Sequence, residues 1–164
     1  MSHAIRTIAT PLGPYLLAAS AGGLTHVQPA GAGGLPAHDA RAARDATVRR
    51  HLDAAQRALD AYFGGEPAAL AGLVLAPSGS AFQERVWQAL REIPFGRTAS
   101  YGEIARRIGR EGGARAVGGA NHDNPLGIVV PCHRVIGADG RLVGYAGGLE
   151  RKRWLLAHEG VLPA

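Results

Sequence analysis

The sequence of 164 residues contains a single cysteine, Cys132. One cysteine excludes an internal disulfide and any zinc site built from several cysteines. No apolar run approaches the length of a membrane span, and the N-terminus lacks the apolar core of a signal peptide. We therefore expect a cytoplasmic protein of the bacterial intracellular type, with no membrane partner. His26 and His38 lack partners at ligand spacing, so we expect no metal site.

Lysine is also nearly absent, because Lys152 is the one lysine among 18 basic residues. The 13 acidic residues leave a net charge of +5. Residues 81–164 carry 12 basic and 8 acidic side chains, whereas residues 1–80 carry 6 and 5. An excess of positive charge in the half that holds Cys132 favours an anionic partner, with nucleic acid as the first candidate. Ordinary solubility charge is the alternative, and charge alone does not decide between them.

Residues 1–77 are predicted to form a small domain of an antiparallel sheet and one helix. Short β-compatible runs over residues 4–10, 15–20 and 24–27 are separated by turns rich in Pro and Gly. Apolar residues then recur at helical spacing from about residue 41 to residue 63. Nothing in this part presents an obvious catalytic group. We assign it a supporting role, with a linker that includes Leu73-Val74-Leu75 near its end.

Residues 78–164 are predicted to form a second, mostly helical domain, so that the chain as a whole is α/β (α+β). Capping-box patterns at Ser80 and Ser100 each begin a helix. A further short helix, from about residue 114 to residue 121, follows a turn that contains glycine. Two short helices joined by such a turn in a basic region are typical of a helix-turn-helix.

The end of the chain is predicted to hold a turn and a last helix. Gly137-Ala138-Asp139-Gly140 lies between Val135-Ile136 and Leu142-Val143, which indicates a hairpin-like turn. The last helix covers about residues 149–158. Its charged run, residues 150–153, is expected to be a solvated face.

The helix predicted over residues 114–121 is unusual for a DNA reader. It lacks the series of Asn, Gln and Arg that reads base edges in a major groove. Its surface consists of small residues and Arg115. Small side chains would let the helix backbone approach a narrow groove, and one Arg could enter the base stack. Tight helix–helix packing at Gly118 and Gly119 explains the same residues equally well.

Cys132 follows the apolar run 126–130 and Pro131, and precedes His133. Thiols attack as thiolates, and a neighbouring imidazole can lower the thiol pKa or accept its proton. The segment therefore resembles one that presents a nucleophile. The alternative is an inert buried cysteine, which is common.

Six motifs, in order and spacing, together resemble the O6-alkylguanine-DNA alkyltransferases over about residues 78–161. The first part of the chain resembles the N-terminal domain of that family more loosely. The motifs are Ser100-Tyr101, Ala114-Arg115-Ala116-Val117-Gly118, Asn124-Pro125, Pro131-Cys132-His133-Arg134-Val135, Gly144-Tyr145-Ala146-Gly147-Gly148 and Leu155-Leu156-Ala157-His158-Glu159-Gly160.

The resemblance implies DNA repair by direct reversal. The alkyl group of O6-alkylguanine, and also of O4-alkylthymine, would move irreversibly to Cys132, once per molecule and without a cofactor. His133 would take the thiol proton through a water molecule, and Glu159 would orient and stabilise His133. Asn124 would hold the turn that carries Cys132. Tyr101 would donate its phenol proton toward the guanine ring nitrogen; by itself, it would be read as a core tyrosine.

The resemblance also implies a monomer that binds double-stranded DNA from the minor groove and flips the target nucleotide out. Arg115 would fill the vacated stack. The groove-facing residues would be Ala116, Gly118, Gly119 and Ala120. The pocket for the base would be formed by Val135, Tyr145, Ala146 and Gly147. Many relatives have Ser at the position of Ala146, so a backbone N–H would have to supply that contact.

Two other classes of function remain as alternatives. A non-catalytic protein of the same fold could mark lesions for other machinery, but relatives of that kind lack the reactive cysteine. A hydrolase with Cys, His and Glu on an unrelated fold is permitted by the adjacent Cys132 and His133. The helix-turn-helix pattern and the basic charge argue against it.

Overall fold

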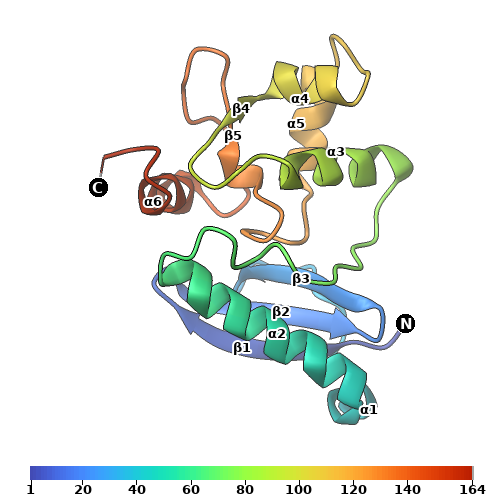
Figure 1. Ribbon diagram of the computed structural model, residues 1–164. Helices are drawn as coiled ribbons and strands as arrows, with labels where there is room; N and C mark the ends of the chain where they lie inside the picture. The colour runs from blue at the N-terminus through green and yellow to red at the C-terminus, as the bar shows by residue number, and fades with distance from the viewer. Residues whose placement is uncertain (164) are drawn as a thin grey trace. The chain divides into compact units, whose positions relative to one another are not determined.

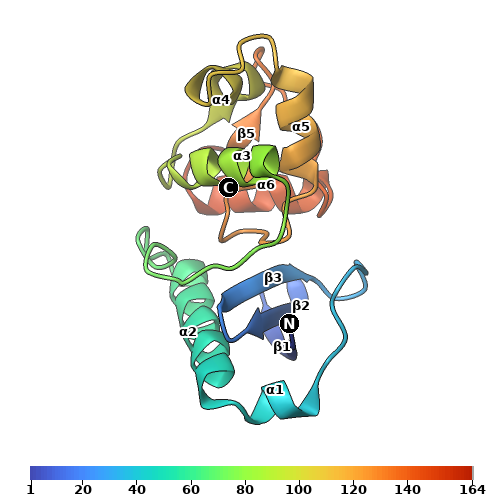
Figure 2. The same ribbon diagram turned by 90° about the vertical axis from the view of Figure 1, so that its right-hand side faces the viewer.

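The computed structural model describes residues 1–163. The chain divides into two compact units, Met1–Ser78 and Gly79–Ala164. Figures 1 and 2 show the elements of each unit. The predicted fold class is confirmed, since an antiparallel sheet with helices is followed by a mainly helical unit. No helix within residues 1–163 is both long and apolar enough to cross a membrane.

The first unit is a three-stranded antiparallel sheet in the order β1-β2-β3. Its strands are β1 (Ala4–Thr10), β2 (Gly13–Ser20) and β3 (Gly23–Pro29). The run near residue 74, which the sequence suggested was linker, instead lies beside this sheet. Leu24 donates its N–H to the Val74 carbonyl at 2.9 Å, and its own carbonyl accepts from Ala76 at 2.8 Å.

One helix was expected in this unit, and the structure has two, α1 (Ala40–Arg44) and α2 (Ala46–Phe63). Asp45 separates them because its extended backbone ends α1 and its carboxylate accepts from the N–H groups that begin α2. The helix α2 packs on the sheet (Figure 2). Its buried face is the one that the apolar spacing predicted: Val48, Leu52, Ala55, Leu59 and Tyr62.

Three helices of the second unit pack together: α3 (Ala81–Arg91), α4 (Tyr101–Arg107) and α5 (Ala114–His122). The Ser80 hydroxyl and the Gln83 side chain form the predicted capping box of α3. The Ser100 hydroxyl accepts from the N–H of Glu103 and so caps α4. The indole of Trp87 donates to the Ala120 carbonyl at 2.8 Å, which fixes α5 against α3.

The segment after α5 leads through a 3₁₀ turn, Cys132–Arg134, into the short strand β5 (Val135–Ile136). The two runs that flank the expected hairpin-like turn do not pair as hairpin strands. The strand β5 pairs in parallel with β4 (Ala99–Ser100) and not with residues 142–143. The turn itself is present, since Gly137 donates to the Arg141 carbonyl at 2.8 Å. Beyond it, the Val143 carbonyl accepts from side chains, so no strand ladder continues.

The last helix, α6 (Leu149–His158), buries Leu155 and Leu156. The expectation of a solvated charged face on residues 150–153 is wrong at one position. Lys152 has no exposed surface, whereas Glu150 and Arg153 are exposed. Trp154 is half-buried and stacks on His158 with ring centroids 5.0 Å apart.

Candidate active site

Cys132 begins the 3₁₀ turn and is 5% exposed. The residues before it form a loop that closes on itself, because Val130 donates its N–H to the Leu126 carbonyl at 2.8 Å. A Pro at position 131 then turns the chain so that the N–H of Cys132 donates to the Val130 carbonyl at 2.7 Å. The thiol is therefore carried by a tightly hydrogen-bonded backbone.

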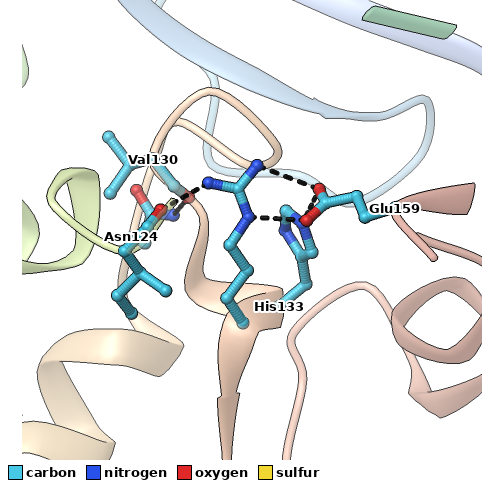
Figure 3. Close-up of polar contacts among 6 residues, drawn as sticks. Asn124, Val130, His133 and Glu159 are labelled. Atoms are coloured by element: carbon cyan, nitrogen blue, oxygen red, sulfur yellow. Dashed lines mark hydrogen bonds and ion pairs between the residues drawn. The ribbon is translucent and has the colours of Figure 1, made fainter. Parts of the chain in front are cut away.

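Asn124 holds this loop from one side (Figure 3). Its amide N–H₂ donates to the Val130 carbonyl at 2.9 Å and to the Leu126 carbonyl at 3.4 Å. Its carbonyl oxygen accepts from the N–H of Leu126 at 2.9 Å. An Asn side chain that mimics backbone in this way fixes a turn that no regular element supports. Asn124 therefore bonds the loop on both sides of Ile128; the role in alkyl transfer that the resemblance implied for it stays a prediction.

His133 and Glu159 lie together in the interior (Figure 3). The imidazole Nε2 is 2.6 Å from a carboxylate oxygen of Glu159, and both side chains are fully buried. Arg134 donates to both oxygens of the same carboxylate, at 2.7 and 3.0 Å, and to the Ile93 carbonyl at 2.7 Å. Breaking a buried ion pair of this kind costs about 3–5 kcal/mol, because one charge is left without its partner.

The ion pair between Arg134 and Glu159 determines the tautomer of His133. It keeps the Glu159 carboxylate ionised, and an ionised carboxylate can only accept a hydrogen bond. The Glu159 carboxylate accepts from Nε2–H, which leaves the lone pair on Nδ1. Among the described residues, the buried Nδ1 has no hydrogen-bond partner. Burial lowers the pKa of His133 despite the neighbouring carboxylate. The imidazole is therefore held neutral, with its basic nitrogen available.

Burial raises the pKa of the Cys132 thiol. The Asn124 amide and the positive charge of Lys152 act in the opposite direction and favour the thiolate. A thiol in this environment keeps its proton until a base accepts it. The arrangement thus calls for the neighbouring imidazole if Cys132 is to act as a nucleophile.

Lys152 connects three segments around the thiol. Its ammonium donates to the carbonyls of Val135, Val143 and Gly144, at 2.6, 3.0 and 3.1 Å. The hydroxyl of Tyr101 donates to the same Val143 carbonyl at 2.9 Å. These bonds of Lys152 tie the helix α6 to β5 and to residues 143–144. Val135, expected to line the base pocket, is fully buried.

The glycine-rich loop, residues 144–148, contains three of the residues expected to line the base pocket. Tyr145 is half-buried, and its ring lies only 2.7 Å from where a side chain at Gly147 would begin. Only glycine fits at position 147 without displacing that ring. Arg151 donates to the Gly147 carbonyl at 2.9 Å, and Ala146 is exposed.

The surface of α5 contains most of the residues expected to face DNA. Arg115, Ala116 and Gly119 are exposed and Gly118 is half-buried, but Ala120 is 4% exposed and lies inside the unit. Ala120, which was expected to face the groove, is therefore not available to contact DNA. A methyl group at Gly118 would meet the Tyr101 ring at an ordinary 3.9 Å, and at Gly119 it would meet nothing within 4 Å. Helix packing alone does not require glycine at either position.

No group of three or more His, Cys, Asp or Glu side chains within residues 1–163 could hold a metal ion.

The family model described as "6-O-methylguanine DNA methyltransferase, DNA binding domain" matches residues 81–161. A methylated-DNA–protein-cysteine methyltransferase of Mycobacterium leprae is 48% identical over 161 residues, 94% of this chain and 90% of that protein. The chain belongs to the 6-O-methylguanine DNA methyltransferase family. The family expected from the sequence motifs is confirmed.

Two further relatives of this methyltransferase family extend the likeness. The protein of the same name from Salmonella typhimurium is 58% identical over 101 residues, and the match spans 62% of this chain but only 59% of that protein. The crystal structure of Mycobacterium tuberculosis OGT in complex with DNA has a TM-score of 0.78 and 41% identity. It covers all of this chain and 96% of that one. The two sequence relatives are both named methylated-DNA–protein-cysteine methyltransferase.

The sequence motifs singled out Asn124, which bonds the loop before Cys132, and the pair His133 and Glu159, but they did not point to some residues that hold this region. The structure brings Cys132 and His133 together with Asn124 and Glu159. Arg134, Asn121 and Lys152 were not singled out, although all three are buried. Asn121 donates to the Cys132 carbonyl at 3.4 Å. The solitary lysine among 18 basic residues was the one available signal for Lys152.

Proposed function

We propose that this chain is a methylated-DNA–protein-cysteine methyltransferase that repairs O6-alkylguanine in double-stranded DNA, with Cys132 as the acceptor. One observation carries the proposal. The single cysteine lies beside a neutral buried histidine whose other nitrogen is paired with a carboxylate. The membership of the family gives this arrangement its substrate class. The chain would act as a monomer on O6-alkylguanine, and on O4-alkylthymine, whose alkyl–oxygen bond is similar.

The proposed reaction is a displacement at the alkyl carbon. A water molecule passes the thiol proton of Cys132 to Nδ1 of His133, and Glu159 stabilises the imidazolium that forms. The sulfur–carbon bond forms as the carbon–O6 bond breaks. The leaving purine takes a proton from the Tyr101 hydroxyl, so that neutral guanine remains in the DNA.

The proposed reaction occurs once per molecule. The product is a thioether, whose carbon–sulfur bond is stable in water. A thiolate is a poor leaving group from a neutral thioether, so we expect no neighbouring side chain to remove the alkyl group. Each chain would therefore repair one lesion and then remain alkylated.

We propose that α5 enters the minor groove and that the target nucleotide is flipped out of the stack. A base inside a duplex is unreachable for a buried thiol. The support lies on the exposed face of α5, where Gly119 leaves room for a close backbone approach and Arg115 is free to enter the stack. Minor-groove contacts discriminate sequence weakly, which suits a protein that searches for lesions.

Intact-mass measurement tests the transfer. The chain is incubated with an O6-methylguanine oligonucleotide, and the modified peptide is mapped. We expect one added methyl group on Cys132, saturating at one equivalent of DNA. Cys132→Ala should gain no mass and still bind DNA. Several lesions repaired per protein would contradict single turnover, and tight binding without added mass would support the lesion-marking alternative.

Arg115→Ala tests base flipping. The variant should repair duplex DNA much more slowly than the parent, while its reaction with free O6-methylguanine base stays close to normal, since only the duplex requires extrusion. The single-turnover rates of both proteins with both substrates give the comparison. Equal losses on the two substrates would contradict a role in flipping.

A further inference from the structure

Ile128 has an unusual backbone conformation. Its φ angle is 68°, and it is the one non-glycine residue with positive φ among residues 1–163. A β-branched residue in this region is a clear outlier, because its side chain crowds the backbone. The residue lies four positions before Cys132, inside the loop that Asn124 holds. Strain that persists at a candidate active site calls for an explanation of what maintains it.

The hydrogen bonds define the turn around Ile128. The N–H of Val129 donates to the Gly127 carbonyl at 2.7 Å, which closes a three-residue turn on Ile128. A γ-turn with a central φ of about +75° is the rare and strained form. A second three-residue turn follows, centred on Pro131 with φ −80° and ψ 63°, and this is the common form. Cys132 is the last residue of the second of these two turns.

Two kinds of contact oppose the strain at Ile128. The Asn124 side chain bonds Leu126 before the strained residue and Val130 after it, so it bridges the turn. The Ile128 side chain itself is buried, with 1% of the residue exposed. Glycine would adopt the positive φ without strain but would leave that buried space empty. The sequence thus retains an isoleucine in a conformation that favours glycine.

We propose that Ile128 is a positioning residue for Cys132, and that restraining its strained turn is a main task of Asn124. Without the amide of Asn124, a residue with a side chain at position 128 would relax toward negative φ. The loop that carries the thiol would then shift away from His133. The inference rests on the proposed alkyl transfer for its function, but the strain itself does not depend on it.

The test compares two substitutions that remove the same buried side chain. Ile128→Gly and Ile128→Ala differ only in the methyl group that makes positive φ unfavourable. At an ordinary position, glycine would be the less stable of the two. Here we expect Ile128→Gly to melt about 2–4 °C above Ile128→Ala in the full chain. A lower melting temperature for Ile128→Gly would show that the turn is not strained.

A second comparison distinguishes a positioning role of Ile128 from a general effect on stability. It asks whether glycine at position 128 restores the methyl transfer that is lost in Asn124→Ala. Asn124→Ala should slow methyl transfer about tenfold more in the Ile128→Ala chain than in the Ile128→Gly chain, since glycine keeps the turn unaided. The readouts are single-turnover transfer from an O6-methylguanine oligonucleotide and the pH profile of Cys132 alkylation by iodoacetamide. The same loss in both chains would overturn the proposal.

The two readouts also distinguish the failure of each idea. If the unmodified chain transfers no methyl group, the proposed function fails. Iodoacetamide alkylation of Cys132 in the same variants would then still report whether glycine at position 128 compensates for the loss of Asn124. If methyl transfer occurs but neither readout shows rescue, only the role of Ile128 fails.

Discussion

Lys152 is the residue whose environment departs most from its usual one. A lysine is rarely buried without a carboxylate partner. Here its ammonium is instead satisfied by the three carbonyls of Val135, Val143 and Gly144. Those carbonyls belong to the strand after Cys132 and to the glycine-rich loop. The lysine thus stabilises the loop and places a positive charge near the thiol.

Burial lowers the pKa of Lys152 from its ordinary 10.5 to about 8. Between these values the unfolded chain binds a proton that the folded chain has lost, so the free energy of unfolding should rise with pH across this range. Denaturant unfolding from pH 7.5 to 10.5 measures the rise. Lys152→Met should reduce it.

The comparison is best made in a Cys132→Ala background. The raised pKa of the Cys132 thiol has the opposite effect on stability, because the unfolded chain releases that proton first. Equal pH slopes with and without Lys152 would show that its ammonium is not desolvated.

Tyr101 is the proton donor in the proposed reaction. Burial, and then the nearby Cys132, raise the pKa of its phenol, so the hydroxyl stays protonated at neutral pH. In the free protein this hydroxyl donates to the Val143 carbonyl, which also accepts from Lys152.

Tyr101→Phe should therefore slow methyl transfer while it changes stability by only about 1 kcal/mol, the net worth of one hydrogen bond. Single-turnover rates, duplex affinity and denaturant unfolding are to be measured together. An unchanged transfer rate would remove Tyr101 from the proton-donor role.

At the scale of elements, α5 has two different faces. Val117, Ala120 and Asn121 are buried, and Asn121 reaches the Cys132 carbonyl. The opposite face is exposed and contains Gly119, next to which there is open space. One short helix therefore connects the proposed DNA surface to the backbone of the nucleophile.

Gly119 allows a test of that surface, because glycine in an exposed helix is a destabilising choice. Gly119→Ala should raise the free energy of unfolding by about 0.5–1 kcal/mol. Gly119→Leu should still fold but should bind duplex DNA more weakly, because its side chain blocks the approach to the groove.

Gln88→Leu, at an exposed position on α3, is the matched control for added apolar surface. Fluorescence anisotropy with a labelled duplex gives the affinities. If both Leu variants bind as the parent does, the α5 surface does not face the groove.

At the scale of the whole molecule, charge is distributed unequally along the chain. The +5 net charge comes mostly from residues 81–164. Two of the basic residues in that part, Arg134 and Lys152, are buried and are unavailable to DNA phosphates. Exposed arginines remain on α4 and just after it, next to the proposed DNA-binding helix α5: Arg106, Arg107 and Arg110.

Duplex affinity should therefore depend strongly on salt. With about four phosphate contacts, the affinity should fall about 100-fold between 50 and 200 mM salt. Transfer from free O6-methylguanine base should change little over the same range, since the base carries no phosphate. Anisotropy titrations and single-turnover rates check the two statements. A salt-independent duplex affinity would contradict binding through the phosphate backbone.

The sequence by itself determined the elements whose signals are local. The helix starts at Ser80 and Ser100 follow from side chains that bond N–H groups three residues away. The buried face of α2 follows from apolar residues repeated at helical spacing. The family, and with it the set around Cys132, could be inferred because its motifs are contiguous in the chain.

Only the tertiary structure decided the features that depend on segments distant in the chain. From the sequence Lys152 was expected at the surface, but β5 and the loop at residues 143–144 supply carbonyls to its ammonium. Ala120 was expected to be exposed, but it is buried and its carbonyl accepts from Trp87 of α3. The positive φ of Ile128 carries no local signal, since isoleucine disfavours it. It exists because Asn124 and the surrounding core hold a conformation that the residue would not adopt alone.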